Sequence, residues 1–229
     1  MNRLLAVETS AEACSAALLI DGETTVFFEH SPMRHADLLL PAISGLLDEA
    51  GIGLAHLDAI VFGRGPGSFT SLRIGIGVVQ GLAWGADIPV VPLSSLAAVA
   101  QDASDASASG AESICVAVDA RMNEVYTANF RRGDNGIVIA ESAERVCSPQ
   151  EVNSTDEKFF IAAGNGFERF SELNTLGSTA AECFPAAVPR AETLCRLAID
   201  WLSGNLPLQA GLAQPVYVRN KVASKPTSG

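Results

Sequence analysis

Residues 58–86 have the sequence DAIVFGRGPGSFTSLRIGIGVVQGLAWGA, and this stretch decides the fold that we expect for the chain. Its first residues belong to a short apolar run, residues 57–63, which is typical of a buried strand. The segment RGPG at 64–67 breaks that pattern, because glycine reaches unusual backbone conformations and proline cannot continue a strand ladder. The hydroxyl side chains that follow suit a helix N-cap, so residues 71–86 are predicted to form a helix.

The predicted helix has glycine at every fourth position, at Gly77, Gly81 and Gly85, and these positions share one face. Each glycine costs about 1 kcal/mol of helix stability relative to alanine, so the sequence needs an outside reason for them. One explanation is close packing against the sheet of the same chain. The other is close approach of a second helix, which can belong to another chain, as on the small-residue helix faces of membrane proteins. The sequence leaves both explanations open.

The glycine-rich loop at 64–67 also has two explanations. Such a loop can hold a phosphate on the free N–H groups that open a helix, or it can simply be a tight turn between a strand and a helix. The dinucleotide pattern GxGxxG is absent, and no lysine follows Gly67 as the phosphate-binding pattern GxxxxGK[ST] requires. The motif evidence therefore favours a tight turn.

The composition indicates a globular protein with a substantial core. Hydrophobic residues make up 48% of the 229 positions and charged residues 18%, enough for one large domain or two compact lobes. The net charge of −11 repels phosphate backbones, which argues against direct, unaided binding of nucleic acid. The one basic cluster is short and lies in the tail, at Arg219, Lys221 and Lys225.

The cysteines and the apolar runs predict a cytoplasmic protein. Five scattered cysteines without a CxxC pair argue against a disulfide framework and a zinc site, and they fit a reducing compartment. The apolar run at 4–7 is too short for the core of a signal peptide. No apolar run approaches the roughly 20 residues that a membrane span needs.

The first half of the chain alternates strand and helix patterns. The expected strands are 3–7, 15–20, 23–29, 57–63 and 89–91, and the expected helices are 36–50, 71–86 and 95–101. Pro41 either kinks the first of these helices or lies near its true first turn. The small polar stretch 102–111 is the best candidate for a boundary, so we expect one lobe at 1–104 and a second at 105–229.

The second half repeats the opening pattern. ICVAVD at 114–119 echoes LLAVE at 4–8, because each is an apolar strand that ends in valine and a carboxylate. The further elements expected in this half are strands at 125–130, 137–141 and 159–163, a turn at 133–136, helices at 167–173 and 191–202, and an extended arm or return strand at 215–219. A doubled β-β-β-α-β-α unit is the plan of the actin-like α/β fold of sugar kinases and Hsp70 ATPases, and we predict that fold.

The candidate catalytic residues are weak. His30, His35 and His56 form no HExxH pattern, so we expect surface or hinge histidines and no metal site. Glu8-Thr9-Ser10 resembles the phosphate-binding turn of actin-like ATPases, although that turn usually begins with aspartate, and its counterpart at 119–121 contains a bulky arginine. The GSF sequence at 67–69 lacks the second glycine of the GxSxG nucleophile motif. We assign no catalytic residue.

Five segments together resemble the TsaB family, formerly called YeaZ. GRGPGSFTSLRIG at 63–75 is similar to the family signature, with Ser71 where the family usually has glycine. The other four follow the family order: VETSAEACSAAL at 7–18, RHADLLLP at 34–41, DARMNEVY at 119–126 and PVYVRNKVA at 215–223. The resemblance runs from end to end and is loose at 142–210.

This resemblance implies an actin-like (ASKHA, ribonuclease H-like) fold with duplicated βββαβα lobes, of which the second is reduced. It implies a non-catalytic subunit of the complex that forms N6-threonylcarbamoyladenosine beside the anticodon of tRNAs reading codons that start with A. The subunit pairs with TsaD, which carries the metal-binding histidines and the ATP site, and the ATPase TsaE joins them. The tRNA is then reached only through the complex. The chain alone binds no cofactor tightly, and ATP or ADP is expected at the interface with TsaD.

Two sets of residues follow from this interpretation. The expected partner interface, which can also form a homodimer when TsaD is absent, consists of Leu39, Ile43, Leu46, Leu47, Ile74, Gly77, Val78, Gly81, Leu82 and Gly85. The loop expected to border a nucleotide consists of Glu8, Thr9, Ser10, Arg64, Gly65, Gly67, Ser68 and Thr70. The main alternative is a stand-alone small-molecule kinase or ATPase of the same fold. A peptidase, suggested only by the older naming of the family, is a second alternative.

Overall fold

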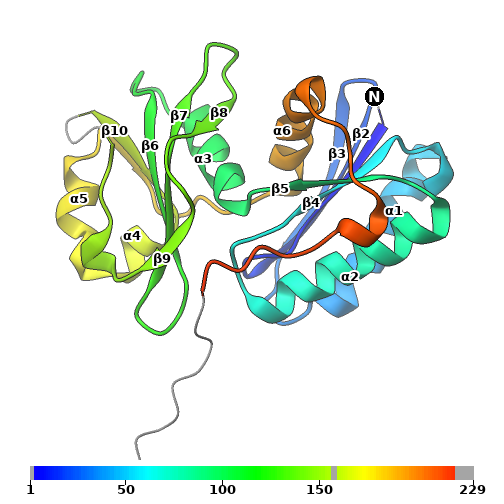
Figure 1. Ribbon diagram of the computed structural model, residues 1–229, viewed down its shortest axis with the longest axis horizontal. Helices are drawn as coiled ribbons and strands as arrows, with labels where there is room; N and C mark the ends of the chain where they lie inside the picture. Colours follow the sequence, from blue (N-terminus) through cyan, green and yellow to red (C-terminus); the bar gives the residue numbers. More distant parts are fainter. Residues whose placement is uncertain (1–2, 156–158, 220–229) are drawn as a thin grey trace, which may run out of the picture.

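The computed structural model describes residues 3–155 and 159–219, and it contains two sheets that follow one another along the chain (Figure 1). The basic residues Lys221 and Lys225 lie outside the described part. The first sheet consists of β1 (Arg3–Glu8), β2 (Ala13–Ile20), β3 (Glu23–His30), β4 (Ala59–Gly63) and β5 (Val90–Leu93), in the order β3-β2-β1-β4-β5. The first three strands form an antiparallel meander, and β4 and β5 extend it in parallel with β1.

The second sheet repeats this topology. It consists of β6 (Ser113–Asp119), β7 (Val125–Arg132), β8 (Val138–Ala140), β10 (Phe160–Ala163) and β11 (Glu182–Phe184), with β9 (Arg145–Cys147) paired to β7. The order β8-β7-β6-β10-β11 places a meander beside two parallel strands, as in the first sheet. The duplicated actin-like α/β fold predicted from the sequence is confirmed.

Helices cover both sheets and fill the space between them (Figure 1). The α-helices are α1 (His35–Ala50), α2 (Phe69–Ala86), α3 (Ser95–Ala106), α4 (Gly166–Arg169), α5 (Asn174–Thr179) and α6 (Ala191–Gly204). Short 3-10 helices are η1 (Leu54–His56), η2 (Pro149–Glu151), η3 (Ser171–Leu173) and η4 (Ala210–Leu212). The helices α1 and α2 cover the outer face of the first sheet, and α4 packs on β6 of the second. No helix in the described part of the chain is long and apolar enough to cross a membrane.

The two faces of the first sheet belong to different cores. Successive side chains of a strand point to opposite faces, so Leu4 and Ala6 of β1 join the core between the two sheets. Leu5 and Val7 instead join the core beneath α1 and α2. Burial on both faces explains why β1 is an uninterrupted apolar run rather than an alternating one.

Each half of the chain supplies a helix to the sheet of the other half. The helix α3, from the first half, packs against β6, β7 and β8 of the second sheet. The helix α6, from the second half, packs against β1, β2 and β4 of the first sheet, and α3 and α6 contact each other. The expected lobe boundary after residue 104 falls inside α3, so this boundary remains a prediction.

The second lobe lacks a counterpart of the long helix α1 among its described residues. The described residues between β8 and β10 form β9 and η2, where the first lobe has the 16-residue helix α1. The helix expected at 167–173 is divided into α4 and η3, because Phe170 adopts an extended backbone with φ −118° and ψ 115°. The polar stretch expected as a boundary begins with helix, since α3 continues to Ala106.

The last described stretch, residues 205–219, contains only the short helix η4 and is otherwise without helix, and we call it the C-terminal arm. It starts beside the first sheet, where Leu208 exchanges two backbone hydrogen bonds of 2.8 Å with Val90. Further on, the Gln80 side chain donates to the Ala213 carbonyl (2.6 Å), and the Val216 N–H donates to the Arg64 carbonyl (2.8 Å). The expected extended arm at 215–219 is therefore present, and no strand is assigned within it.

Candidate functional site

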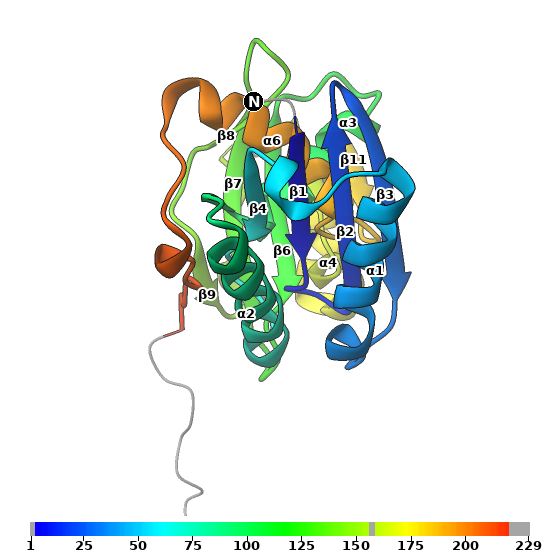
Figure 2. The same cartoon turned by 90° about the vertical axis from the view of Figure 1, so that its right-hand side faces the viewer.

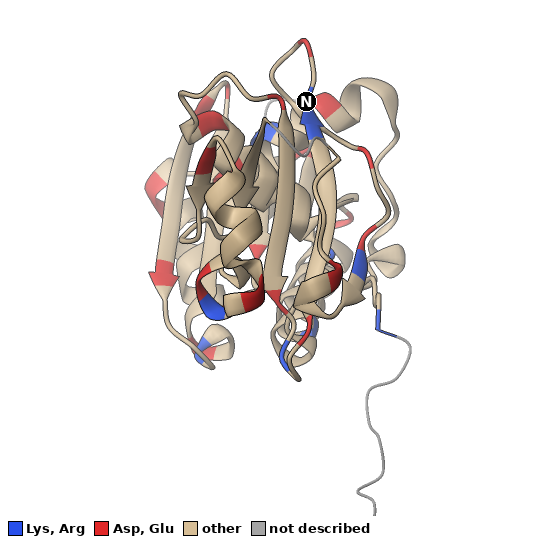
Figure 3. Cartoon of the chain, turned by 90° about the vertical axis from the view of Figure 1, so that its left-hand side faces the viewer, with Lys and Arg blue, Asp and Glu red and all other residues tan. Residues whose placement is uncertain are grey.

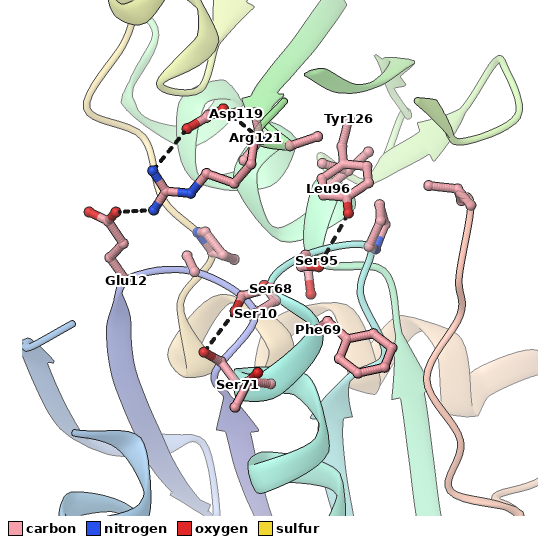
Figure 4. Close-up of a pocket in the computed structure, with 18 of the residues that line it drawn as sticks. Ser10, Glu12, Ser68, Phe69, Ser71, Ser95, Leu96, Asp119, Arg121 and Tyr126 are labelled. Carbon is pink, nitrogen blue, oxygen red and sulfur yellow. Dashed lines mark hydrogen bonds and ion pairs between the residues drawn. The ribbon is translucent and has the colours of Figure 1, made fainter. Parts of the chain in front are cut away.

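A cavity of 630 Å³ opens between the two lobes (Figure 4). Its walls come from the β1–β2 turn, the glycine-rich loop and first turn of α2, the start of α3, the β6–β7 turn and the C-terminal arm. The described residues that line it are Ser10, Ala11, Glu12, Pro32, Met33, His35, Pro66, Gly67, Ser68, Phe69, Thr70, Ser71, Arg73, Ser95, Leu96, Val99, Val118, Asp119, Ala120, Arg121, Tyr126, Asn165, Pro189, Val216, Tyr217, Val218 and Arg219.

Glu8 lies behind the cavity wall and holds the β1–β2 turn in place. Its side chain is buried, with the residue only 1% exposed. One carboxylate oxygen accepts from the Ser10 N–H (2.6 Å) and the other from the Ser95 hydroxyl (2.8 Å). Burial raises the pKa of Glu8, while the hydrogen bonds from Ser10 and Ser95 oppose that shift. Both oxygens are engaged within the protein, which indicates a structural role for this carboxyl group.

Three glycines let the neighbouring chain segments approach the β1–β2 turn. A Cβ atom at Gly63 would overlap the Glu8 carboxylate, and one at Gly75 would overlap the Thr9 side chain. A Cβ atom at Gly67 would lie 2.5 Å from the Ser10 carbonyl oxygen, which accepts a hydrogen bond from the Ser68 N–H (2.8 Å). The turn and the glycine-rich loop therefore fit together as one tightly packed unit.

The glycine-rich loop is also tied to the second lobe. Gly65 has a φ of 95°, in the left-handed region that glycine reaches easily, and its bond to Pro66 is cis. The Arg64 guanidinium forms two hydrogen bonds of 3.0 and 3.2 Å with the Glu144 carboxylate. The helix α2 then begins at Phe69, two residues earlier than predicted.

The β6–β7 turn faces the β1–β2 turn across the cavity and is ion-paired to it. Arg121 extends between Asp119 of its own turn (3.5 Å) and Glu12 of the opposite one (2.8 Å), as Figure 4 shows. Arg169 forms ion pairs with the same two carboxylates. The three residues Arg121, Met122 and Asn123 all have positive φ, which gives this turn its shape.

Two aromatic rings and an arginine form the lip of the cavity. The Arg73 guanidinium lies 3.3 Å from the centroid of the Phe69 ring and 5.0 Å from that of Tyr217. The two ring centroids are 5.6 Å apart, and both residues are about half exposed. This contact joins α2 to the C-terminal arm.

The structure brings the predicted nucleotide loop together but places only part of it at the cavity. Ser10, Gly67, Ser68 and Thr70 line the cavity. The other four members, Glu8, Thr9, Arg64 and Gly65, are not among its lining residues. A nucleotide role for this loop remains a prediction.

Sequence reasoning missed several lining residues. Glu12, Arg73 and Tyr217 lie in segments that resemble the family, which was the only signal available for them. The expectation of surface or hinge histidines is wrong for His35, which is 1% exposed and hydrogen-bonds through Nε2 to the Ala13 carbonyl (3.1 Å). His30 and His56 are exposed, as expected.

The second candidate site is the outer face of α1 and α2, which lie side by side in front of the first sheet in Figure 2. We call it the two-helix face and define it by its exposed residues Leu40, Gly45, Gly77, Gly81, Trp84 and Gly85. Cβ atoms added at Gly77, Gly81 or Gly85 would meet nothing within 4 Å among the described residues. Packing against the sheet of the same chain therefore does not explain these three glycines.

The structure corrects part of the expected partner interface. Leu39, Ile43, Leu46 and Leu47 are at most 7% exposed and lie in the core beneath α1, where their side chains cover the first sheet. They cannot contact a partner directly. Ile74, Val78 and Leu82 are half-buried at the flank of α2. The exposed apolar side chains at this face are those of Leu40 and Trp84, which are 50% and 76% exposed.

The remaining titratable groups outline no further reactive site. Within residues 3–155 and 159–219, no group of three or more His, Cys, Asp or Glu side chains could hold a metal ion. All five cysteines are free, and burial raises the pKa of the Cys115 and Cys195 thiols to about 12.

Acidic residues are more widespread than basic ones on the side of the second lobe that Figure 3 shows.

Comparisons with known proteins match proteins described as TsaD, TsaB or YeaZ. The family model described as "TsaD: tRNA N6-adenosine threonylcarbamoyltransferase" matches residues 29–195. The "tRNA threonylcarbamoyladenosine biosynthesis protein TsaB" of Escherichia coli is 36% identical over 99% of both chains, and that of Haemophilus influenzae is 39% identical over 99% of this chain and 97% of its own. The solved structure "YeaZ from Pseudomonas aeruginosa" is 41% identical, with a TM-score of 0.86 over 95% of this chain and 100% of that one.

Proposed function

This chain belongs to the TsaB (YeaZ) family, and from that premise we propose that it is a non-catalytic subunit of the machinery that makes threonylcarbamoyladenosine in tRNA. Its relatives are named as tRNA threonylcarbamoyladenosine biosynthesis proteins, and this chain therefore has a role in the same biosynthesis. The modification stands beside the anticodon of tRNAs that read codons starting with A. The acidic chain reaches tRNA only through the complex, and it works in the cytoplasm.

The proposed partner is TsaD, the threonylcarbamoyltransferase whose family model this chain also matches. Two proteins of one fold can pair through corresponding surfaces, so the same surface forms a homodimer when TsaD is absent. TsaE joins the pair as a third subunit. ATP or ADP binds at the interface with TsaD, near Ser68 and Thr70, rather than tightly to this chain alone.

The observation that carries the proposal is the row of exposed glycines on the two-helix face. Gly77, Gly81 and Gly85 each lower the stability of α2 by about 1 kcal/mol relative to alanine, and no described residue of the chain packs on them. A helix of another subunit could approach the α2 backbone closely along this row. The exposed Trp84 beside it would supply the large apolar contact that interfaces favour near their centres.

The engaged carboxylates support a non-catalytic role. Glu8 and Asp119 end the equivalent strands β1 and β6, where the fold places its phosphate-binding turns. Glu8 is buried with both oxygens hydrogen-bonded, and Asp119 is ion-paired to Arg121 and Arg169. Neither carboxylate is free to order a metal ion or act as a base.

The test is the Gly81→Leu variant, with Gly204→Leu as the matched control. Both glycines are exposed and helical, and an added Cβ atom at either would meet nothing within 4 Å among the described residues, but Gly204 ends α6 away from the two-helix face. Both variants are expected to keep the far-ultraviolet circular dichroism of the parent. Gly81→Leu should lose binding to purified TsaD in titration calorimetry and lose support of threonylcarbamoylation of tRNA, whereas Gly204→Leu should keep both.

Normal TsaD binding by a folded Gly81→Leu variant would refute the proposed surface. ATP hydrolysis at useful rates by the purified chain alone would instead favour a stand-alone kinase or ATPase.

A further inference from the structure

We propose that residues 214–219, at the end of the C-terminal arm, form a strap that holds the two lobes closed over the cavity and can release them. The sequence of the strap is QPVYVR. Pro215 cannot continue a helix and keeps the residue before it extended, and the two valines favour an extended backbone. An extended chain from Ala213 to Arg219 reaches roughly 20 Å. The residues from Val216 to Arg219 all line the cavity.

The strap starts from a firm anchor on the first lobe. Leu208 exchanges two backbone hydrogen bonds of 2.8 Å with Val90. Ala213 is fully buried in the core beneath α1 and α2, and its carbonyl accepts from the Gln80 side chain (2.6 Å). Backbone pairing and burial therefore fix the origin of the strap.

The end of the strap contacts the second lobe. The Arg219 guanidinium donates to the Ala120 carbonyl (3.1 Å) and forms an ion pair with Glu124, and both partners lie in the β6–β7 turn. Figure 1 shows the arm running from the first lobe toward the second. The same turn is also joined to the first lobe by the ion pair between Arg121 and Glu12 (2.8 Å), which Figure 4 shows. The strap thus adds a second cross-lobe contact at this turn.

The contact at Arg219 is only partly satisfied. Its Nε atom is buried and has no hydrogen-bond partner among the described residues, and its Nη1 atom contacts the sulfur of Met122, a weak acceptor. A buried donor without a partner costs free energy that the other bonds must offset. The Glu124 side chain is 37% exposed, so water competes for this ion pair. The end of the strap is therefore expected to release while its origin stays anchored.

The core between the two sheets keeps the lobes together when the strap releases. It contains Leu4 and Ala6 of the first sheet, Ile114 and Val116 of the second, and residues of α3 and α6. These side chains are buried against one another, so separating them would expose a large apolar surface. The shared core can therefore act as the hinge of an opening motion.

Polar contacts join the lobes beside the cavity, and water can replace them. Arg64 forms an ion pair with Glu144 (3.0 Å), and the Tyr126 hydroxyl donates to the Gly67 carbonyl (3.4 Å). Opening at this side exposes polar groups rather than the shared core. Release of the strap would widen the entrance to the cavity, and the strap would thereby control the access of small molecules to it.

Pulsed electron paramagnetic resonance on the full chain tests the strap. One spin label is attached to the native Cys183 of the second lobe, which is exposed while the other four cysteines are buried. The second label is attached to the thiol of a Glu49→Cys variant, at an exposed position near the end of α1 in the first lobe. Labelled chain is diluted with unlabelled chain, so that the measured distance is the one within a single molecule.

Arg219→Gln in this background should move part of the molecules to a second distance between the labels. Losing a partly exposed ion pair is expected to raise the ratio of open to closed chains about two- to fivefold. The matched control is Arg131→Gln, which also removes an ion-paired arginine, but its partner Glu141 lies in the same lobe, so the distances should not change. An unchanged distribution for Arg219→Gln, or equal changes for both variants, would overturn the proposal.

Two further measurements separate release of the strap from general damage. Glu124→Gln should produce the same shift as Arg219→Gln, and the double variant little more, because both substitutions remove one contact. Hydrogen exchange in the buried strands β2 and β10 should remain that of the parent. Additive shifts, or faster exchange in these strands, would overturn the proposal. The strap belongs to the isolated chain, so its failure would leave the proposed docking onto TsaD untouched.

Discussion

Glu8 couples the stability of the protein to pH. Burial raises its pKa in the folded state above the unfolded value, so the folded chain holds the proton more tightly. The stability that this carboxyl contributes is full below the unfolded pKa and is lost as pH rises through the folded one. Glu8→Gln keeps an acceptor for the Ser10 N–H and a partner for Ser95, and it carries no charge.

Urea unfolding of Glu8→Gln and the parent over a pH series checks this prediction. The free energy of unfolding of the variant minus that of the parent should increase as pH rises above about 4.5. The other titrating groups are the same in both proteins, so their contributions cancel in this difference. A difference that stays flat or shrinks with pH would contradict the assigned cause.

Two glycines should respond in opposite ways to the same added methyl group. Gly63→Ala places Cβ against the Glu8 carboxylate and is expected to lower the free energy of unfolding by about 1–3 kcal/mol. Gly77→Ala places it in open space on a helix and should raise that free energy by up to about 1 kcal/mol. Chemical denaturation of both variants measures the contrast, and two changes of equal sign would contradict the packing described here.

At the residue scale the sequence identified where the chain turns but not what each glycine touches. Glycine and proline at 64–67 predict a turn from local chemistry alone. The contacts of Gly63 with Glu8 and of Gly75 with Thr9 join residues far apart in the chain, and no local pattern encodes them. His35 was missed for the same reason, because its burial depends on the packing of α1 against β2.

At the element scale, the long helices were predictable and some of the shortest elements were not. Apolar spacing identified α1, and the turn and hydroxyl side chains before α2 identified that helix, whereas β9 and β11 have only three residues each and carry no readable pattern. Periodicity reveals that a helix has an apolar face but not what covers it. Leu39, Ile43, Leu46 and Leu47 were therefore assigned to a partner although they cover the sheet of their own chain.

The C-terminal arm gives a prediction at this scale. Tyr217→Ala removes the ring that contacts Phe69 and Arg73, a loss of about 0.5–1.5 kcal/mol that falls on the arm rather than on either core. Limited proteolysis should therefore cut the arm of the variant faster than that of the parent. The rate of cleavage within α2 serves as the internal control, and a parallel rise there would indicate general destabilisation instead.

At the scale of the whole molecule, the exchange of α3 and α6 predicts that the halves depend on each other. A fragment of residues 1–104 lacks α6, which covers β1, β2 and β4, so it should expose that apolar face and fail to fold. Mixing it with residues 105–229 should restore the circular dichroism of the intact chain. A soluble, cooperatively folded fragment 1–104 would contradict this dependence.

The crossed arrangement of α3 and α6 also sets an order of events during synthesis. A ribosome delivers β1 long before α6, because that helix begins only at Ala191. Until α6 has emerged, the nascent first sheet has no cover for Leu4 and Ala6, so chaperones have an apolar surface to hold during that interval.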